Sequence, residues 1–279
     1  MPFALDSLRV RYLGMINDKP QFALVDASSG LLFQNEALLQ RDALGLTNVY
    51  AYRSAAGDLA ILKVVHLNAC DELDHVRRLE EARMPNLVTA KLLARPSSPV
   101  DFGCFVMPYA GCTVKQHSFA DERAACAAVA QLARACKTLV DDYGLFYMDM
   151  KPANVAVSDG GAPVLLDYGA MCRADQRTGV TYPSPRYPEG QVPGAEGQVS
   201  YGLGVLLFLL LSAEPTTERD LRFCETPRLA DVTAGRISSA VAAACRLCSG
   251  TLARRAIVSA LVFQCPLEEL LRDLGESVV

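Results

Sequence analysis

The sequence predicts an α+β chain with two lobes, the first rich in strands and the second mostly helical. In the first third, short apolar runs alternate with turn residues, whereas the remainder holds long apolar runs at helical spacing. The chain has 279 residues, of which 51% are hydrophobic, enough for one large domain or two lobes. We expect the lobes to comprise residues 1–108 and 109–279.

The first lobe is predicted to contain several antiparallel strands. Leu8–Leu13 and Phe22–Val25 are apolar runs followed by turn residues. Val49–Arg53 and Leu59–Val65 flank Ala-Ala-Gly-Asp, which is typical of a hairpin. Residues 1–40 indicate extra strands, which either extend this sheet or cover its edge.

The remaining elements follow from spacing and capping residues. Either Asp121 or Ser118 is expected to cap a long Ala-rich helix that ends near Tyr143. The other segments are a helix at 70–84, strands at 87–93 and 104–109, and helices at 198–213, 228–248 and 251–274, the last broken near Pro266.

Composition excludes some classes of function. The net charge of −4 argues against a nucleic-acid partner. The longest apolar stretch, Leu203–Leu211, is shorter than the about 20 residues that span a bilayer, so we expect no membrane association. The ten cysteines lie mostly among apolar neighbours, which indicates reduced thiols in an intracellular protein, cytoplasmic or nuclear. Cys245 and Cys248 form a lone C-x-x-C that lacks the second pair of a zinc site.

The segment from residue 147 to 169 carries the clearest chemical pattern. It reads Y-M-D-M-K-P-A-N and then, after twelve residues, D-Y-G. The pattern contains Asp149, Lys151, Asn154 and Asp167 in this order. Phosphoryl transfer from a nucleotide needs one carboxylate for the attacking hydroxyl, a cation for the phosphoryl group, and oxygen ligands for magnesium.

This segment resembles the catalytic core of eukaryotic-type protein kinases, whose motifs are H-R-D-x-K-P-x-N and D-F-G. Tyr147 and Met148 stand where that family has His and Arg, and Tyr168 stands for its Phe. The resemblance implies a bilobal protein-kinase-like fold, with ATP and Mg²⁺ as cofactors and protein substrates phosphorylated on Ser or Thr. Asp149 and Lys151 would then be catalytic, and Asn154 and Asp167 would bind the metal.

The resemblance extends into the first lobe. Lys63, in Ala-Ile-Leu-Lys, aligns with the lysine that binds the nucleotide phosphates. Its carboxylate partner would be Glu72 or Asp74; Glu72 is favoured because its side chain is longer. The residues expected to surround the nucleotide, beside Lys63, are Gly45, Val49, Ile61, Met107, Tyr109 and Ala156.

Two positions depart from the family pattern, and a third is expected to form an ion pair. The glycine-rich loop retains Gly45 alone, which implies fewer backbone contacts to phosphates. Val199 stands where the family has an Asp that anchors the catalytic loop. Glu189, in Tyr-Pro-Glu, is expected to form a buried ion pair with Arg255, or else with Arg254.

The general character of the chain, compact and divergent, resembles that of viral kinases of the herpesvirus sort. Two alternatives to an active kinase stay open. One is a pseudokinase that binds nucleotide or acts as a scaffold, which the missing glycines and Val199 favour. The other is a small-molecule kinase of the aminoglycoside-phosphotransferase type; Lys151 and the D-Y-G glycine argue against it. The sequence predicts no oligomeric state.

Overall fold

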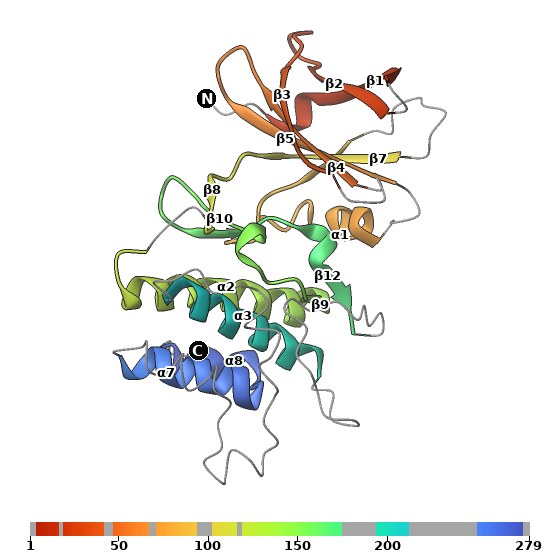
Figure 1. Cartoon of the computed structure of the whole chain (residues 1–279). Helices are drawn as coiled ribbons and strands as arrows, with labels where there is room; N and C mark the ends of the chain where they lie inside the picture. The colour runs from red at the N-terminus through yellow and green to blue at the C-terminus, as the bar shows by residue number, and fades with distance from the viewer. Residues whose placement is uncertain are drawn as a thin grey trace. The chain divides into compact units, whose positions relative to one another are not determined.

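The computed structural model contains mixed helices and sheets and is α+β (Figure 1). It describes residues 4–16, 19–41, 47–66, 71–93, 102–115, 119–174, 194–211 and 250–275. The chain divides into two compact units, Met1–Tyr109 and Ala110–Val279. They are called the first and the second unit below, and each is described by itself.

The first unit is built on an antiparallel sheet of five strands in the order β3-β4-β5-β7-β6. The strands are β3 (Gln34–Arg41), β4 (Thr47–Arg53), β5 (Leu59–His66), β6 (Lys91–Leu93) and β7 (Phe102–Pro108). The predicted hairpin is confirmed, because β4 pairs with β5 across a turn in which the Ser54 amide donates to the Asp58 carbonyl at 2.9 Å. Gly57 supplies the left-handed conformation of this turn, with φ of 94°.

A separate hairpin covers one face of this sheet. It consists of β1 (Leu8–Ile16) and β2 (Lys19–Asp26), which pair with each other and not with β3. The Tyr52 hydroxyl, which is buried, donates to the Phe22 carbonyl of the hairpin at 2.7 Å. Of the two expectations for residues 1–40, extension of the sheet is confirmed by β3, whereas β1 and β2 cover a face of the sheet and not its edge.

The opposite face of the sheet carries helix α1 (Asp71–Leu79), which packs on β6 and β7. With both faces covered, the six successive residues Ala60–Val65 of β5 are buried, which explains why all of them except Lys63 are apolar. The helix ends earlier than predicted, and the strand predicted at 87–93 begins only at Lys91. The cause is an intervening turn, in which Arg83 and Asn86 adopt positive φ of 42° and 61°.

The second unit is centred on helix α2 (Glu122–Tyr143). Asp121 caps its start as predicted, since its Oδ1 accepts the Ala124 amide at 2.8 Å, while Ser118 lies outside the described residues. Gly144 ends the helix in the left-handed conformation, with φ of 62°. Helices α3 (Ala195–Leu211) and α8 (Leu267–Asp273) pack against it (Figure 1).

The C-terminal helical segment is broken as the sequence predicts. Helix α7 (Thr251–Val258) continues into a π-helical turn, and α8 begins directly after Pro266. The helix predicted at 228–248, with Cys245 and Cys248, lies outside the described residues. None of the helices that the structure describes is both long and apolar enough to cross a membrane.

Two small antiparallel sheets complete the second unit. One has the order β11-β10-β8, formed by β8 (Cys112–Thr113), β10 (Val155–Val157) and β11 (Pro163–Leu165). The other pairs β9 (Leu145–Tyr147) with β12 (Met171–Arg173). These short strands bracket the segment that carries the kinase-like motif.

Candidate active site

The motif segment is closed into a compact loop by two strand pairings. Met171 pairs with Tyr147, so that the two ends of the segment lie side by side. Inside it, β10 and β11 form a hairpin, and the Leu166 amide donates to the Asn154 carbonyl at 3.0 Å. Asn154 therefore lies beside the chain that leads directly into Asp167, although the two residues are distant in sequence.

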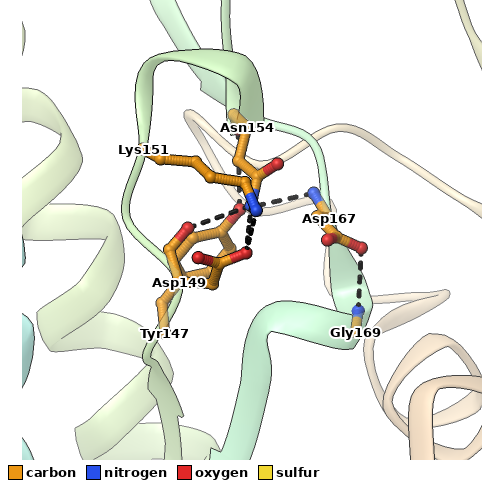
Figure 2. A network of polar contacts seen from close by, with 6 residues as sticks. All are labelled: Tyr147, Asp149, Lys151, Asn154, Asp167 and Gly169. Carbon is orange, nitrogen blue, oxygen red and sulfur yellow. Dashed lines mark hydrogen bonds and ion pairs between the residues drawn. The ribbon is translucent and has the colours of Figure 1, made fainter. Parts of the chain in front are cut away.

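Three polar side chains of this loop form what we call the Asp149 network (Figure 2). Lys151 Nζ lies 2.5 Å from Asp149 Oδ2. Asn154 Nδ2 donates to the same oxygen at 3.1 Å and to the Asp149 carbonyl at 2.9 Å. Asn154 is buried, whereas the side chains of Asp149 and Lys151 are 20% and 33% exposed. The carboxylate is thus fixed in orientation and still reaches the surface.

Asp167 begins a short turn on the other side of this network. Its Oδ1 accepts the Gly169 amide at 3.1 Å, which holds the carboxylate at the start of the 3-10 turn Tyr168–Ala170. Tyr168 itself is buried. Figure 2 shows the Asp167 carboxylate and the Asn154 amide on neighbouring segments of the loop.

Tyr147 joins the two sides of the loop through its hydroxyl group. Its hydroxyl donates to the Asn154 carbonyl at 3.5 Å and accepts the Asp167 amide at 3.4 Å (Figure 2). The ring is fully buried. Burial, followed by the nearby Asp167 and Asp149 carboxylates, raises the pKa of Tyr147 well above its ordinary value of 10.0. The hydroxyl therefore stays neutral and able to donate. Sequence reasoning noted this residue only as a replacement for His.

The first unit contains a buried ion pair. Lys63 Nζ lies 2.5 Å from Glu72 Oε1, and the two side chains are 10% and 8% exposed. Asp74, the alternative partner, instead pairs with Arg77 at 2.5 Å on the exposed face of α1. The structure therefore pairs Lys63 with the carboxylate that the sequence favours. The ammonium also lies over the Phe105 ring, 5.9 Å from its centroid.

Three other candidate nucleotide-binding residues share the sheet face of Lys63. Val49 is directly opposite Lys63, and Ile61 is opposite Met107. Because side chains alternate along a strand, Ile61 and Lys63 point to the same face. This face is the one that faces α1, since the intervening residues, such as Leu62, belong to the core beneath the β1–β2 hairpin.

The other candidates lie elsewhere. Tyr109 follows β7, is half-exposed, and donates its amide to the Leu59 carbonyl at 3.1 Å. Ala156 is buried in β10, the central strand of its small sheet in the second unit. Gly45 lies outside the described residues.

Asn154 and Asp167 are the residues for which the sequence predicts magnesium binding. Among the residues that the structure describes, no group of three or more His, Cys, Asp or Glu side chains is arranged for a metal ion. Magnesium usually takes one or two protein carboxylates and completes its shell with water and phosphate oxygens. An amide oxygen and a carboxylate held on adjacent backbone fit that limited requirement.

The residues expected to stabilise the second unit are placed only in part. Glu189 lies outside the described residues. Arg255 contacts Asp273 at 2.5 Å, and Asp273 also accepts the Ser259 hydroxyl. Val199 is buried in α3, so this position offers the loop no carboxylate.

Comparison with known proteins gives a partial match. No protein-family model matches the chain. The chain is 33% identical over 101 residues to the serine/threonine-protein kinase PknB of Mycolicibacterium smegmatis. The match covers 32% of this chain and 16% of that protein, so the chain spans about a sixth of its length. The similarity points to a relationship with protein kinases, and a viral source stays a prediction that it does not support.

Proposed function

We propose that the chain is a divergent serine/threonine protein kinase with a bilobal kinase-like fold. Residues 1–108 would form the nucleotide-binding lobe and residues 109–279 the catalytic lobe. The observation that carries the proposal is the Asp149 network, in which a half-buried carboxylate is held by Lys151 and Asn154. The partial match to a serine/threonine kinase supports the same class.

The proposed reaction moves the γ-phosphoryl group of ATP to a Ser or Thr hydroxyl of a protein substrate. The hydroxyl oxygen bonds to the γ-phosphorus, the bond from that phosphorus to the bridging oxygen breaks, and ADP leaves. Asp149 Oδ1 or Oδ2 orients the hydroxyl and receives its proton. Lys151 neutralises charge on the moving group.

The cofactors are assigned by the chemistry of the donors. Asn154 and Asp167 would hold Mg²⁺, which neutralises phosphate charge when bound. In the first unit, Lys63 would bind the phosphates of ATP, with Glu72 fixing the direction of its ammonium group. The apolar residues of the same sheet face, with Tyr109 and Ala156, would contact the nucleotide base.

The proposal includes an intracellular location, which buried thiols among the described residues support. Cys104 and Cys136 are buried as free thiols. Burial raises the pKa of each to about 12 from 9.0. Such thiols are weak nucleophiles and persist in a reducing compartment.

One observation favours a pseudokinase instead. Val199 is buried in α3, where the family resemblance implies an anchoring Asp. Without that anchor, other contacts must position the catalytic groups of the loop. If those contacts are weaker, the protein would stay folded but lose phosphoryl transfer.

The acceptor class is tested in three separate reactions that contain the protein, γ-labelled ATP and Mg²⁺. The acceptor is casein in the first, a basic protein in the second and an aminoglycoside in the third. We expect labelled protein that yields phosphoserine or phosphothreonine on hydrolysis. Label on the aminoglycoside, or on tyrosine, would contradict the assignment. Well-folded protein that labels nothing would favour the pseudokinase.

A further inference from the structure

Gly103 lies in β7, where helix α1 packs on the sheet of the first unit. It is paired with Val65, two residues from Lys63, and therefore faces α1. Leu73 of α1, which is 6% exposed, occupies the space above it. A Cβ atom at residue 103 would lie 2.2 Å from Leu73 Cδ1, 3.1 Å from Cδ2 and 3.2 Å from Cγ. The present position of α1 thus requires glycine at this point of β7.

Rotation of the leucine does not remove the conflict. Turning χ2 moves both methyl groups of Leu73 but leaves Cγ in place, 3.2 Å from the added carbon. Moving Cγ needs a change in χ1, which is restricted in helices. Val76 and Leu79, which follow on the buried face of α1, are also packed. We therefore expect the helix to shift by a few tenths of an ångström away from β7 when residue 103 gains a side chain.

The position of α1 controls the ion pair because Leu73 and Glu72 are adjacent in the helix. Glu72 Oε1 contacts Lys63 Nζ at 2.5 Å. We propose that Gly103 is a positioning residue that sets the distance between α1 and the sheet, and thereby whether Glu72 reaches Lys63. The effect on phosphoryl transfer rests on the proposed function, whereas the effect on the ion pair does not.

The first test is a mutant cycle between Gly103→Ala and Glu72→Gln. Alanine is intrinsically the better residue inside a strand, so a loss in Gly103→Ala reports the contact with Leu73. We expect kcat/KM for ATP to fall by up to about tenfold, since a displacement of about 1 Å can cost on the order of a hundredfold and the expected shift is smaller. In the Glu72→Gln background the same change should add little. The inference would be overturned if the two single losses in kcat/KM multiplied in the double variant, as independent effects do, or if Gly103→Ala were fully active.

A second variant tests the direction of the effect. Leu73→Ala removes all three atoms that the new Cβ would meet, so the double variant Gly103→Ala/Leu73→Ala should recover most of the lost activity. It should also be more stable than Leu73→Ala alone, because the added methyl fills part of the space. Gly160→Ala is the control, since the nearest atom to its new Cβ is Ser158 Oγ at 3.9 Å.

The same cycle read by chemical unfolding separates this inference from the kinase proposal. If the wild-type protein transfers no phosphate, the kinase proposal fails, but the unfolding free energies still report the Lys63–Glu72 contact. Gly103→Ala and Glu72→Gln should then be non-additive. Additive effects on unfolding would overturn the role of Gly103, whatever the protein does with ATP.

Discussion

Tyr147 is the residue whose single hydroxyl group joins both sides of the loop that carries the Asp149 network. Tyr147→Phe keeps the buried ring but removes the bonds to the Asn154 carbonyl and the Asp167 amide. The Asn154 carbonyl keeps the Leu166 amide as a donor, so we expect the two lost bonds to cost about 0.5–1.5 kcal/mol each. We expect a lower kcat and a higher Mg²⁺ concentration for half-maximal activity, with little change in KM for the protein substrate. A Mg²⁺ titration of both proteins checks this, and identical curves would contradict the role assigned to the hydroxyl.

The Lys63–Glu72 pair is predicted to serve binding rather than stability. Glu72→Ala removes the carboxylate partner of a buried ammonium group and should lower the free energy of unfolding by about 3–5 kcal/mol. Replacing both residues with apolar ones, as Lys63→Met/Glu72→Leu, should restore stability, because neither charge is then buried.

The double variant should nevertheless bind ATP poorly. Urea unfolding and ATP calorimetry on the three proteins separate the two effects. A double variant that is as unstable as Glu72→Ala would show that the pair is needed for packing instead.

At the scale of elements, helix α2 depends on its capping residue. Asp121→Ala removes the acceptor for the Ala124 amide and should cost about 1 kcal/mol, whereas Asp121→Asn retains an acceptor oxygen and should cost less. Thermal unfolding of both variants tests this order. Equal losses would mean that the negative charge near the helix start, rather than the hydrogen bond, stabilises α2.

Local signals predicted the elements whose ends are marked by specific residues. The β4–β5 hairpin, the Asp121 cap and the break at Pro266 are such cases, because turn glycine, capping oxygen and proline each act within a few residues. The early end of α1 was missed, because Arg83 adopts positive φ without any local sequence signal, whereas Pro85 and Asn86 are turn residues that mark only the later part of this segment. That the β1–β2 hairpin covers a sheet face depends on distant packing and was equally beyond the sequence.

At the scale of the whole molecule, buried thiols make stability depend on alkaline pH. Burial raises the pKa of Cys104, Cys136 and Cys265 from 9.0 to about 12. Between these values the unfolded chain loses protons that the native chain keeps, so the stability present below pH 9 falls as the pH rises toward 12.

Each thiol contributes a decline of up to about 1.4 kcal/mol per pH unit. Urea unfolding from about pH 8 to about pH 11 should show this decline, and Cys136→Ala should make it less steep. An unchanged slope in Cys136→Ala would contradict the assignment.

The sequence predicted which residues make up the candidate site but not the contacts that hold them together. Spacing along residues 147–169 identified Asp149, Lys151, Asn154 and Asp167, because that loop is a continuous stretch of chain. The bridge that the Tyr147 hydroxyl makes within this stretch, and the close approach of α1 to Gly103, depend on how the chain folds back on itself. Such relations need the packed structure.

The measurement that tests the central claim most directly compares phosphoryl transfer with Mg²⁺-dependent ATP binding in Asp149→Asn and Asp167→Asn. The account predicts that Asp149→Asn binds Mg²⁺-ATP but transfers no γ-phosphate, because it alters the group that orients the hydroxyl. Asp167→Asn should lose both, because it alters a metal ligand. Asp159→Asn, an exposed carboxylate in the same unit, is the control with the same change of charge. Transfer by Asp149→Asn at the wild-type rate would contradict the account.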